Sequence, residues 1–295
     1  MKNTDMYKKV TEKIIAMIEQ DNCLPWQKSW VSVANGCCSG VSGKPYSLLN
    51  HFLLGFRSGK YYTFDQVKKL GYSVKKGSKA GFIVFWKMLR ITDVDSNGDP
   101  VESTIPVLRY YNVFHQDDTT IPAENLPLND NLEELPDAES VFSGYIAREQ
   151  INLVEELSDE CYYSPSTDSI HLAKREQFKS ANFFYSVAFH ESVHSTMKAT
   201  RCNREASRYG KNVSFGSEEY SKEELVAQLG SAMLCARLGI DTSDTVNQDA
   251  AYIKSWLSAL KSDPSMIVTA AGKAEKAADY ILYGHHQDVT ENLEA

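Results

Sequence analysis

Apolar residues recur at helical spacing near the start of the chain. Val10, Ile14 and Ile18 fall on one face of a segment from about residue 5 to residue 20, which predicts an amphipathic helix. A second, shorter helix is predicted within 61–71, with Thr63 or Asp65 as its cap and Gly71 at its end.

Two strands are predicted after these helices. The segment 74–87 begins as a loop rich in lysine and glycine and continues as an apolar strand, and 106–115 supplies a second strand. Asn97 and Gly98 between them are typical of a hairpin turn. The N-terminal part is therefore predicted to be a small α+β unit with a short sheet.

A longer helix is predicted over 180–199, which contains neither glycine nor proline, with Asn182 as a candidate N-cap. Val187 precedes His190 by three residues, and His194 continues the same face. Because helical residues four apart lie on one face, both imidazoles can reach a single metal ion.

Glu191 completes the pattern His-Glu-x-x-His, and its carboxylate lies close enough to polarise a metal-bound water. The alternative is a core helix with two hydrogen-bonded histidines. That alternative is weaker, because two histidines and an acid make a poor buried face unless they bind something. The pattern favours a metal site, and we expect one Zn²⁺ per chain.

A further helix, predicted over 217–236, offers the third protein ligand that a catalytic zinc needs. Glu224 flanks its apolar side and is the candidate ligand, while Gln228, one turn on, could hydrogen-bond a ligand. Glu223 is the nearest competitor. Both acids could instead complement the dipole of the first turn of the helix.

Composition narrows the class of protein. The 295 residues have room for two domains, and a hydrophobic content of 42% is typical of a folded globular chain. No stretch approaches the roughly 18–20 apolar residues of a membrane helix, and the N-terminus lacks the pattern of a secretion signal. The six cysteines show no C-x-x-C spacing. We expect a cytoplasmic protein with no membrane partner.

Charge is unevenly distributed along the chain. Residues 1–90 hold 15 Lys or Arg and five acids, whereas 121–295 hold 15 basic and 28 acidic residues. This asymmetry predicts a basic module that meets a polyanion, followed by an acidic module with another task. An acidic segment with three prolines separates them. The predicted parts are a first domain over 1–118, a linker over 119–138, a second domain over 139–287 and a tail over 288–295.

Basic and aromatic residues are interleaved in the first module. Cations can follow the phosphates of single-stranded nucleic acid while exposed rings stack on its bases, at roughly 1–3 kcal/mol per base. For any single residue, a solvated lysine face over an aromatic core is the commoner arrangement. The candidate nucleic-acid-binding residues are Lys44, Tyr46, Arg57, Tyr61, Tyr62, Lys75, Lys76, Lys79, Trp86 and Lys87.

A series of short motifs, in order along nearly the whole chain, also resembles a known family. The N-terminal domain of ArdC-type antirestriction proteins, which TraC-type primases of conjugative plasmids share, is similar to Pro25-Trp26, Gly43-Lys-Pro-Tyr46, Lys76-Gly-Ser-Lys79 and Phe85-Trp-Lys87. The family's zincin-type metallopeptidase domain is similar to His190-Glu-x-x-His194, Arg201-Cys-Asn-Arg204 and Glu223-Glu-Leu-Val-Ala-Gln-Leu-Gly230. Gln228 departs from the pattern, because relatives are expected to have an acid there.

The resemblance implies an α+β chain, in which a small single-stranded-DNA-binding domain precedes a mostly helical zincin-like metallopeptidase domain. Its members shield incoming plasmid or mobile-element DNA from restriction. In such a fold the hairpin predicted over 162–172 can offer an edge strand to an extended peptide.

Three functions stay open at this point. The chain binds single-stranded DNA and, as a zinc metalloendopeptidase, cleaves a protein on or near it; or it coats DNA and its metal site is non-catalytic; or it is a cytoplasmic metallopeptidase whose basic part only stabilises the fold. The charge asymmetry argues against the third function. Glu191, which a purely structural site does not require, favours retained chemistry.

Overall fold

The computed structural model describes residues 3–21, 24–25, 37–55, 57, 59–94, 100–122, 137–204, 218–242 and 250–284. Contacts divide the chain into two compact units, one of Met1–Ala16 with Asn35–Asp130 and one of Met17–Ala34 with Asn131–Ala295.

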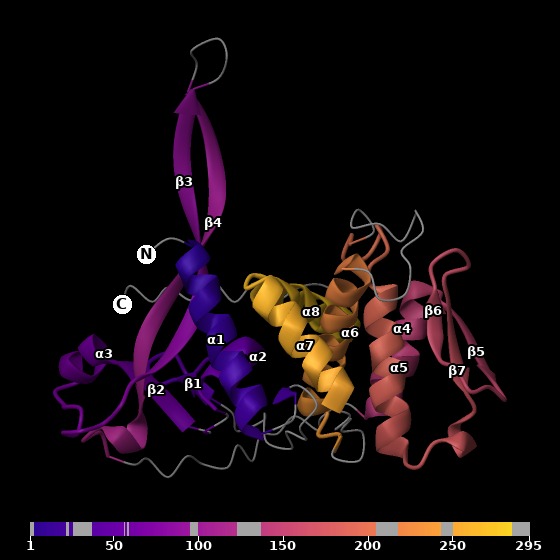
Figure 1. The fold of residues 1–295 in the computed structure, drawn as a ribbon, viewed down its shortest axis with the longest axis horizontal. Coiled ribbons are helices and arrows are strands. Elements are labelled where there is room, and N and C mark those ends of the chain that lie inside the picture. The colour runs from indigo at the N-terminus through magenta and orange to yellow at the C-terminus, as the bar shows by residue number, and fades with distance from the viewer. Residues whose placement is uncertain are drawn as a thin grey trace. The chain divides into compact units, whose positions relative to one another are not determined.

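The N-terminal unit is built on a four-stranded sheet with the order β1-β2-β4-β3 (Figure 1). β1 and β2 are parallel, while β4 is antiparallel to both β2 and β3. The long hairpin of β3 and β4 pairs from Gly81↔Val113 to Val94↔Pro100. The elements up to the end of this unit are α1 (Asn3–Asp21), β1 (Cys37–Ser39), α2 (Leu48–Leu53), β2 (Gly59–Thr63), α3 (Phe64–Lys69), β3 (Gly81–Val94), β4 (Pro100–His115) and the 3₁₀ turn η3 (Gln116–Asp118).

The first helix and both strands predicted for this unit are confirmed, and of the two caps predicted for the helix within 61–71, Thr63 is the one observed. Residues 61–63 belong to β2, and Thr63 caps α3 in a capping box with Gln66. Gly71, with φ +82°, ends the helix as predicted. The predicted hairpin turn at Asn97 and Gly98 lies outside the described residues.

The segment after β4 still belongs to the N-terminal unit. The backbone N–H of Thr120 donates to the carbonyl of Ser73 at 2.8 Å, and Thr119 forms a β-bridge with Val74. Of the predicted linker, 123–136 lies outside the described residues, as does the predicted tail.

The second unit is mostly helical, with a three-stranded sheet of order β5-β7-β6. β5 and β7 are parallel, and β6 and β7 form the antiparallel hairpin predicted over 162–172. Its elements are α4 (Ala138–Glu149), β5 (Asn152–Glu156), β6 (Tyr162–Ser164), β7 (Ser169–Ala173), the 3₁₀ turn η4 (Arg175–Gln177), α5 (Ala181–Ser195), α6 (Glu218–Arg237), α7 (Ala250–Ser262) and α8 (Met266–Tyr283).

Helices α5 and α6 pack closely where Gly230 faces Val193. A Cβ at Gly230 would lie only 2.8 Å from Cγ2 of Val193, so the absence of a side chain allows the approach. Ser180 caps α5 by accepting a hydrogen bond from the backbone N–H of Phe183, and Asn182, the predicted cap, lies inside the helix. The expected fold, an α+β unit followed by a mostly helical one, is confirmed. Among the described helices, none has the length and apolarity needed to cross a membrane.

Candidate nucleic-acid interface and metal centre

The aromatic residues predicted to bind nucleic acid divide into buried and exposed rings. Tyr46, Tyr61 and Tyr62 are only 7%, 4% and 5% exposed, and the first two belong to the core of the sheet. A buried ring cannot stack on a base, so these three tyrosines are core residues. Trp86 is 44% exposed, with its ring centroid 6.3 Å from that of Tyr7, and remains available for stacking.

The predicted basic residues are all exposed, and Arg57 and Lys75 are among those engaged within the protein. Arg57 forms ion pairs with Asp117 at 3.2 Å and Asp118 at 2.8 Å. Nζ of Lys75 donates to the backbone carbonyl of Asp117 at 2.8 Å. The other exposed lysines of the prediction are Lys44, Lys76, Lys79 and Lys87.

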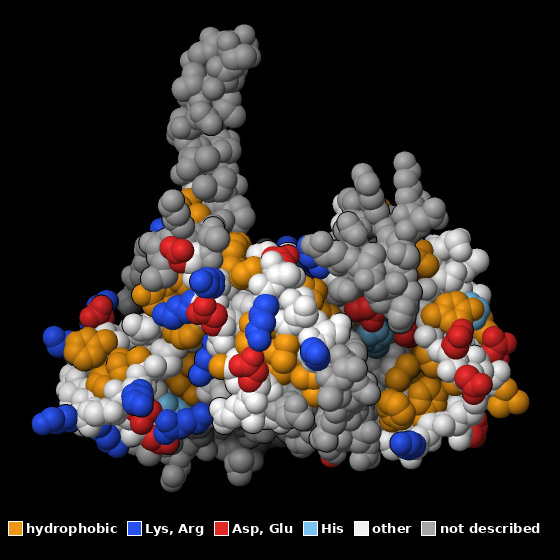
Figure 2. All heavy atoms as spheres, viewed as in Figure 1, with side chains coloured by type: hydrophobic (Ala, Val, Ile, Leu, Met, Phe, Trp, Pro, Cys, Tyr) orange, Lys and Arg blue, Asp and Glu red, His pale blue; other side chains and the backbone are white. Residues whose placement is uncertain are grey.

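Two exposed rings that the sequence interpretation missed lie at the ends of α3. Phe64 is 49% and Tyr72 39% exposed, and Lys68 and Lys69 occupy the last turn between them. Figure 2 shows hydrophobic and basic side chains side by side on this part of the surface. Helical spacing gave no signal for them, because Phe64 lies three positions before the buried Val67, a spacing that shares one face of a helix, and Tyr72 lies beyond the end of α3.

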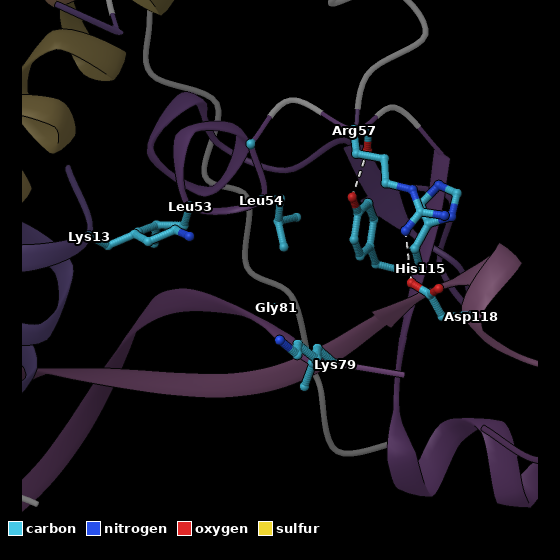
Figure 3. Close-up of a pocket in the computed structure, with 11 residues that line it drawn as sticks. Lys13, Leu53, Leu54, Arg57, Lys79, Gly81, His115 and Asp118 are labelled. Carbon is cyan, nitrogen blue, oxygen red and sulfur yellow. Dashed lines mark hydrogen bonds and ion pairs between the residues drawn. The ribbon is translucent and has the colours of Figure 1, made fainter. Parts of the chain in front are cut away.

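A pocket of about 270 Å³ lies in the same unit and contains Arg57 at one end (Figure 3). Its wall includes Lys79, which follows the Lys/Gly loop, and Lys13 of α1, to which the sequence interpretation gave no role.

The second unit brings three of the predicted metal ligands together. Nε2 of His190 and Nε2 of His194, both on α5, are 3.2 Å apart. The carboxylate of Glu224 on α6 lies 3.5 Å from the first nitrogen and 3.3 Å from the second. No other group of three or more potential ligands from His, Cys, Asp and Glu converges within the described ranges.

These spacings fit a tetrahedral metal ion. Ligand atoms about 2.1 Å from a tetrahedral centre lie roughly 3.4 Å from one another. The two imidazole nitrogens, 3.2 Å apart, are close to that value, and Oε2 and Oε1 of Glu224 lie 3.5 Å from the first nitrogen and 3.3 Å from the second. The donor set of two imidazoles and a carboxylate also suits Zn²⁺ and leaves one position for water.

The electrostatics of the centre favour a positive charge between these groups. Burial opposes ionisation of Glu224, but the imidazoles of His190 and His194 outweigh it and lower the pKa of the carboxyl. Burial likewise opposes protonation of His194, but the carboxylates of Glu223 and Glu224 outweigh it and raise the pKa of the imidazole. A divalent cation would supply the charge that these groups stabilise.

The remaining predicted residues surround the ligands. Glu191 is on α5 between the two histidines and is 7% exposed. Glu223 faces the other side of His194, with an oxygen 3.7 Å from Nδ1, which has no hydrogen-bond partner. Gln228 lies one turn beyond Glu224 on α6 and is half-buried.

Arg204 is a buried residue of this centre to which the sequence interpretation assigned no role. Its guanidinium donates to Glu223 at 2.7 Å, to Oγ1 of Thr196 at 2.7 Å and to the carbonyl of Val193 at 2.9 Å. Arg204 thereby holds Glu223 beside His194 and donates to the carbonyl of Val193 in the last turn of α5.

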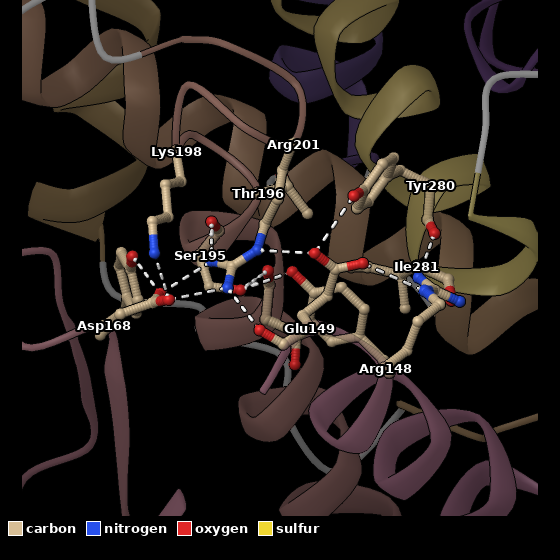
Figure 4. A network of polar contacts seen from close by, with 12 residues as sticks. Arg148, Glu149, Asp168, Ser195, Thr196, Lys198, Arg201, Tyr280 and Ile281 are labelled. Carbon is tan, nitrogen blue, oxygen red and sulfur yellow. Dashed lines mark hydrogen bonds and ion pairs between the residues drawn. The ribbon is translucent and has the colours of Figure 1, made fainter. Parts of the chain in front are cut away.

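A second arginine with a buried side chain contacts the same helix end (Figure 4). Arg201 donates to the carbonyl of Ser195 at 2.9 Å and to both carboxylate oxygens of Asp168 at 2.8 and 2.9 Å. It also forms an ion pair with Glu149 of α4 at 3.1 Å. The only signal for either arginine in the sequence was their place in a motif shared with the resembled family.

Both halves of the chain match known families. Residues 4–114 match the N-terminal domain of anti-restriction factor ArdC, and residues 141–273 match the zincin-like metallopeptidase family. The order of the two matches is the order of the two units described above.

Solved structures of one antirestriction protein are similar over nearly the whole chain. The metal-free crystal structure of ArdC from plasmid R388 is 32% identical, with a TM-score of 0.69 over 96% of this chain and 100% of that one. Its Mn(II)-bound structure is 30% identical, with a TM-score of 0.65 over 93% of this chain and 96% of that one.

Similar proteins of other lengths are also known. A DNA primase TraC of Escherichia coli is 33% identical over 97% of this chain, and a second is 32% identical over 96%, but the chain spans only 28% and 20% of their lengths. The uncharacterized protein y4eC of Sinorhizobium fredii (strain NBRC 101917 / NGR234) is 32% identical over 98% of this chain and 95% of its own length. With both domains matched in order and an ArdC structure covered from end to end, the chain belongs to the ArdC family of antirestriction proteins.

Proposed function

We propose that the protein binds single-stranded DNA without sequence preference and protects incoming mobile-element DNA with the help of a zinc metallopeptidase centre. The observation that carries the catalytic part is the convergence of His190, His194 and Glu224, with one ligand atom from each within 4.8 Å of the others, beside the buried Glu191. The Mn(II)-bound structure of the R388 ArdC supports a divalent metal at such a centre.

Each residue of the centre has a distinct part in peptide hydrolysis. A bound Zn²⁺ would polarise the peptide carbonyl and lower the pKa of water. His190, His194 and Glu224 would hold the ion. Glu191 takes a proton from the attacking water and delivers it to the leaving nitrogen. Glu223, fixed by Arg204, orients the imidazole of His194 from its Nδ1 side.

The substrate of this centre would be a protein on or near the DNA. β6 is an edge strand of the β5-β7-β6 sheet and packs near α5, so an extended peptide can pair with it beside the histidines.

The variant Glu191→Gln tests the catalytic proposal. It keeps the ligands and the size of the side chain but cannot accept a proton, so metal content and DNA affinity should be unchanged while protection of a plasmid entering a restricting host is lost. Glu176→Gln, an exposed acid on η4, is the matched control and should protect normally. Full protection by Glu191→Gln would exclude proteolysis as the mechanism and leave coating of DNA as the function.

DNA binding is supported by the exposed rings among lysines in the N-terminal unit. Phe64 and Tyr72 flank Lys68 and Lys69, and the Lys75–Lys76 loop follows directly. This loop is anchored, because the backbone N–H of Lys75 donates to the carbonyl of Asp118 at 2.9 Å. Cations held on such a frame can follow phosphates while the rings stack on bases.

Titration of labelled single-stranded and duplex DNA at two salt concentrations tests this proposal. We expect a salt-sensitive preference for single strands, and the triple variant Lys75/Lys76/Lys79→Ala should bind more weakly with a flatter salt dependence. Phe64→Ala should cost about 1–3 kcal/mol of binding. Tyr283→Ala, at a 50% exposed ring of α8, is the control. Equal affinity of wild type and triple variant at both salt concentrations would remove this surface from DNA binding.

A further inference from the structure

The pocket of the N-terminal unit gathers charged groups from segments far apart in the sequence. Lys13 comes from α1, the apolar wall from the end of α2 and Lys79 from the loop before β3, while Arg57, which precedes β2, pairs with Asp118 of η3 (Figure 3). Its volume is about 270 Å³, and its lining residues are Lys13, Leu53, Leu54, Gly55, Arg57, Tyr61, Lys79, Ala80, Gly81, His115 and Asp118.

The charges of the pocket do not balance. Arg57 is compensated by Asp118 at 2.8 Å and by Asp117 at 3.2 Å. Lys13 and Lys79 are exposed and have no ion-pair or hydrogen-bond partner among the described residues. Two uncompensated ammonium groups give the pocket a positive charge, and an anion bound there would balance it.

The frame around the two lysines is held in place without a ligand. Oγ of Ser78, next to Lys79, donates to the backbone carbonyl of Asp118 at 3.2 Å. The hydroxyl of Tyr61 donates to the carbonyl of Arg57 at 2.6 Å. A cation on a fixed frame loses less conformational entropy when it binds an anion, so the site is partly pre-organised.

The opposite wall is apolar and tightly packed. A Cβ at Gly81 would lie 2.8 Å from Cδ2 of Leu54, so the start of β3 closes directly against the end of α2. The resulting surface of Leu53 and Leu54 suits an apolar edge such as that of a deoxyribose. The volume is below the roughly 300–1,000 Å³ of most small-ligand pockets, which suits one phosphate with its sugar and excludes a run of stacked bases.

We propose that this pocket binds a single phosphate of the DNA strand, shared between Lys13 and Lys79. The inference rests on the proposed binding of single-stranded DNA and deepens it. It adds α1 to the interface and gives the Lys75–Lys79 loop a fixed point of attachment on the DNA strand, because Lys79 lies only three residues after Lys76.

A salt-dependence cycle tests whether one phosphate is shared. Single-stranded oligothymidylate is titrated over a range of salt concentrations with wild type, Lys13→Ala, Lys79→Ala and the double variant. For single strands each neutralised phosphate contributes roughly 0.7 to the slope of log K against log salt. A shared phosphate predicts that the double variant loses about 0.7 of slope in total, whereas two separate phosphates predict about 1.4.

Lys8→Ala is the matched control. Lys8 lies on the same helix, is paired with Glu12 at 3.9 Å and does not line the pocket, so its removal should leave affinity and slope unchanged. The thermal unfolding of all variants should match that of wild type, since the replaced side chains are exposed.

The outcomes separate this inference from the DNA-binding proposal. The shared phosphate is overturned, and DNA binding left intact, if the double variant loses about 1.4 of the salt slope. The same conclusion follows if Lys13→Ala behaves like Lys8→Ala while the Lys75 and Lys76 variants bind weakly. Wild type that binds no single-stranded DNA overturns both. A coupled loss of about 0.7 supports the inference.

Discussion

The carboxylate of Asp168 is a hydrogen-bond acceptor for several side chains of the second unit, among them Arg201, which contacts the end of α5. It accepts from both terminal nitrogens of Arg201 at 2.8 and 2.9 Å, from Nζ of Lys198 at 2.6 Å and from the hydroxyl of Tyr163 at 2.9 Å. Its backbone has φ +47°, a conformation that asparagine adopts as readily as aspartate. Asp168→Asn therefore removes the charge while it keeps the size and the turn.

The stability that this charge contributes follows from its pKa. Burial opposes ionisation, but the hydrogen bonds from Arg201, Lys198 and Tyr163 outweigh it and lower the pKa of Asp168 from 3.8 to about 2. A difference of nearly two units corresponds to about 2 kcal/mol of unfolding free energy. We expect at least this loss in Asp168→Asn at neutral pH, because Arg201, 1% exposed, also loses its partner.

The pH dependence gives the prediction its sign. Because the pKa is lowered in the folded state, the contribution is fully present above the unfolded pKa of 3.8 and is lost as the pH falls towards about 2. The variant lacks it at every pH. The difference in unfolding free energy between the two proteins should therefore be constant at neutral pH and should narrow below about pH 4.

Urea unfolding of both proteins in EDTA, followed at several pH values by far-UV circular dichroism, measures this difference. Asp159→Asn, at an exposed acid of the same unit, is the control and should differ from wild type by less than about 0.5 kcal/mol. Equal stability of Asp168→Asn and wild type at neutral pH, or a difference that does not narrow in acid, would refute the reasoning.

Three further predictions concern packing and metal. Gly230→Ala should destabilise the second unit by about 1–3 kcal/mol, because the new Cβ would lie 2.8 Å from the β-branched side chain of Val193. Gly144→Ala on α4, where no atom lies within 4 Å of the new Cβ, should instead stabilise the protein by about 0.5–1 kcal/mol. Thermal unfolding measures both effects. Asn50→Ala should cost about 2–5 kcal/mol, because Asn50 exchanges two buried hydrogen bonds with the backbone of Val84 at 2.8 and 2.9 Å, and chemical denaturation measures the loss. Zn²⁺ at a hundredfold excess over its dissociation constant should raise the unfolding free energy by about 2.7 kcal/mol, and EDTA should reverse the effect. Calorimetry measures both changes. A melting temperature that Zn²⁺ leaves unchanged would exclude a metal site in the folded state.

Spacing within one helix was sufficient to predict where His190 and His194 meet. Residues four apart share a face in any α-helix, so their convergence depends on no other element. Glu224 needed a further step, namely that the polar flank of an apolar helix face lies at the rim of the core. The structure places its carboxylate at the two imidazoles, whereas Glu223 turns to Arg204.

The polar partners of the centre could not be derived in this way. Arg204 lies in a loop after α5, and its contact with Glu223 spans 19 residues. Asp168 lies in the turn before β7, and its contact with Arg201 spans 33 residues. Such contacts depend on how loops close over the core, which neither periodicity nor propensity encodes.

The aromatic residues of the N-terminal unit show the same limit in a sharper form. Tyr61 and Tyr62 are neighbours on β2, so their rings point to opposite faces of the sheet. If only one face of the sheet were covered by other residues, one of these two rings would be exposed. Both are buried, because Tyr61 packs with Ile83 and Val113 while Tyr62 lies over Gly40, where a Cβ would collide with its ring.

Burial on both faces of β2 therefore changes which residues can meet a base. The strand that carries the tyrosines becomes the support, and the exposed cations and rings nearest to it along the chain are those that follow it, in α3 and the loop up to Lys79. Phe64 and Tyr72 can be exposed at little cost because the capping box at Thr63 and the left-handed Gly71 hold α3 without them. A double replacement of Phe64 and Tyr72 should accordingly weaken DNA binding without lowering the melting temperature. Replacement of Tyr61 should instead lower the melting temperature, and DNA binding should be lost only when the protein unfolds.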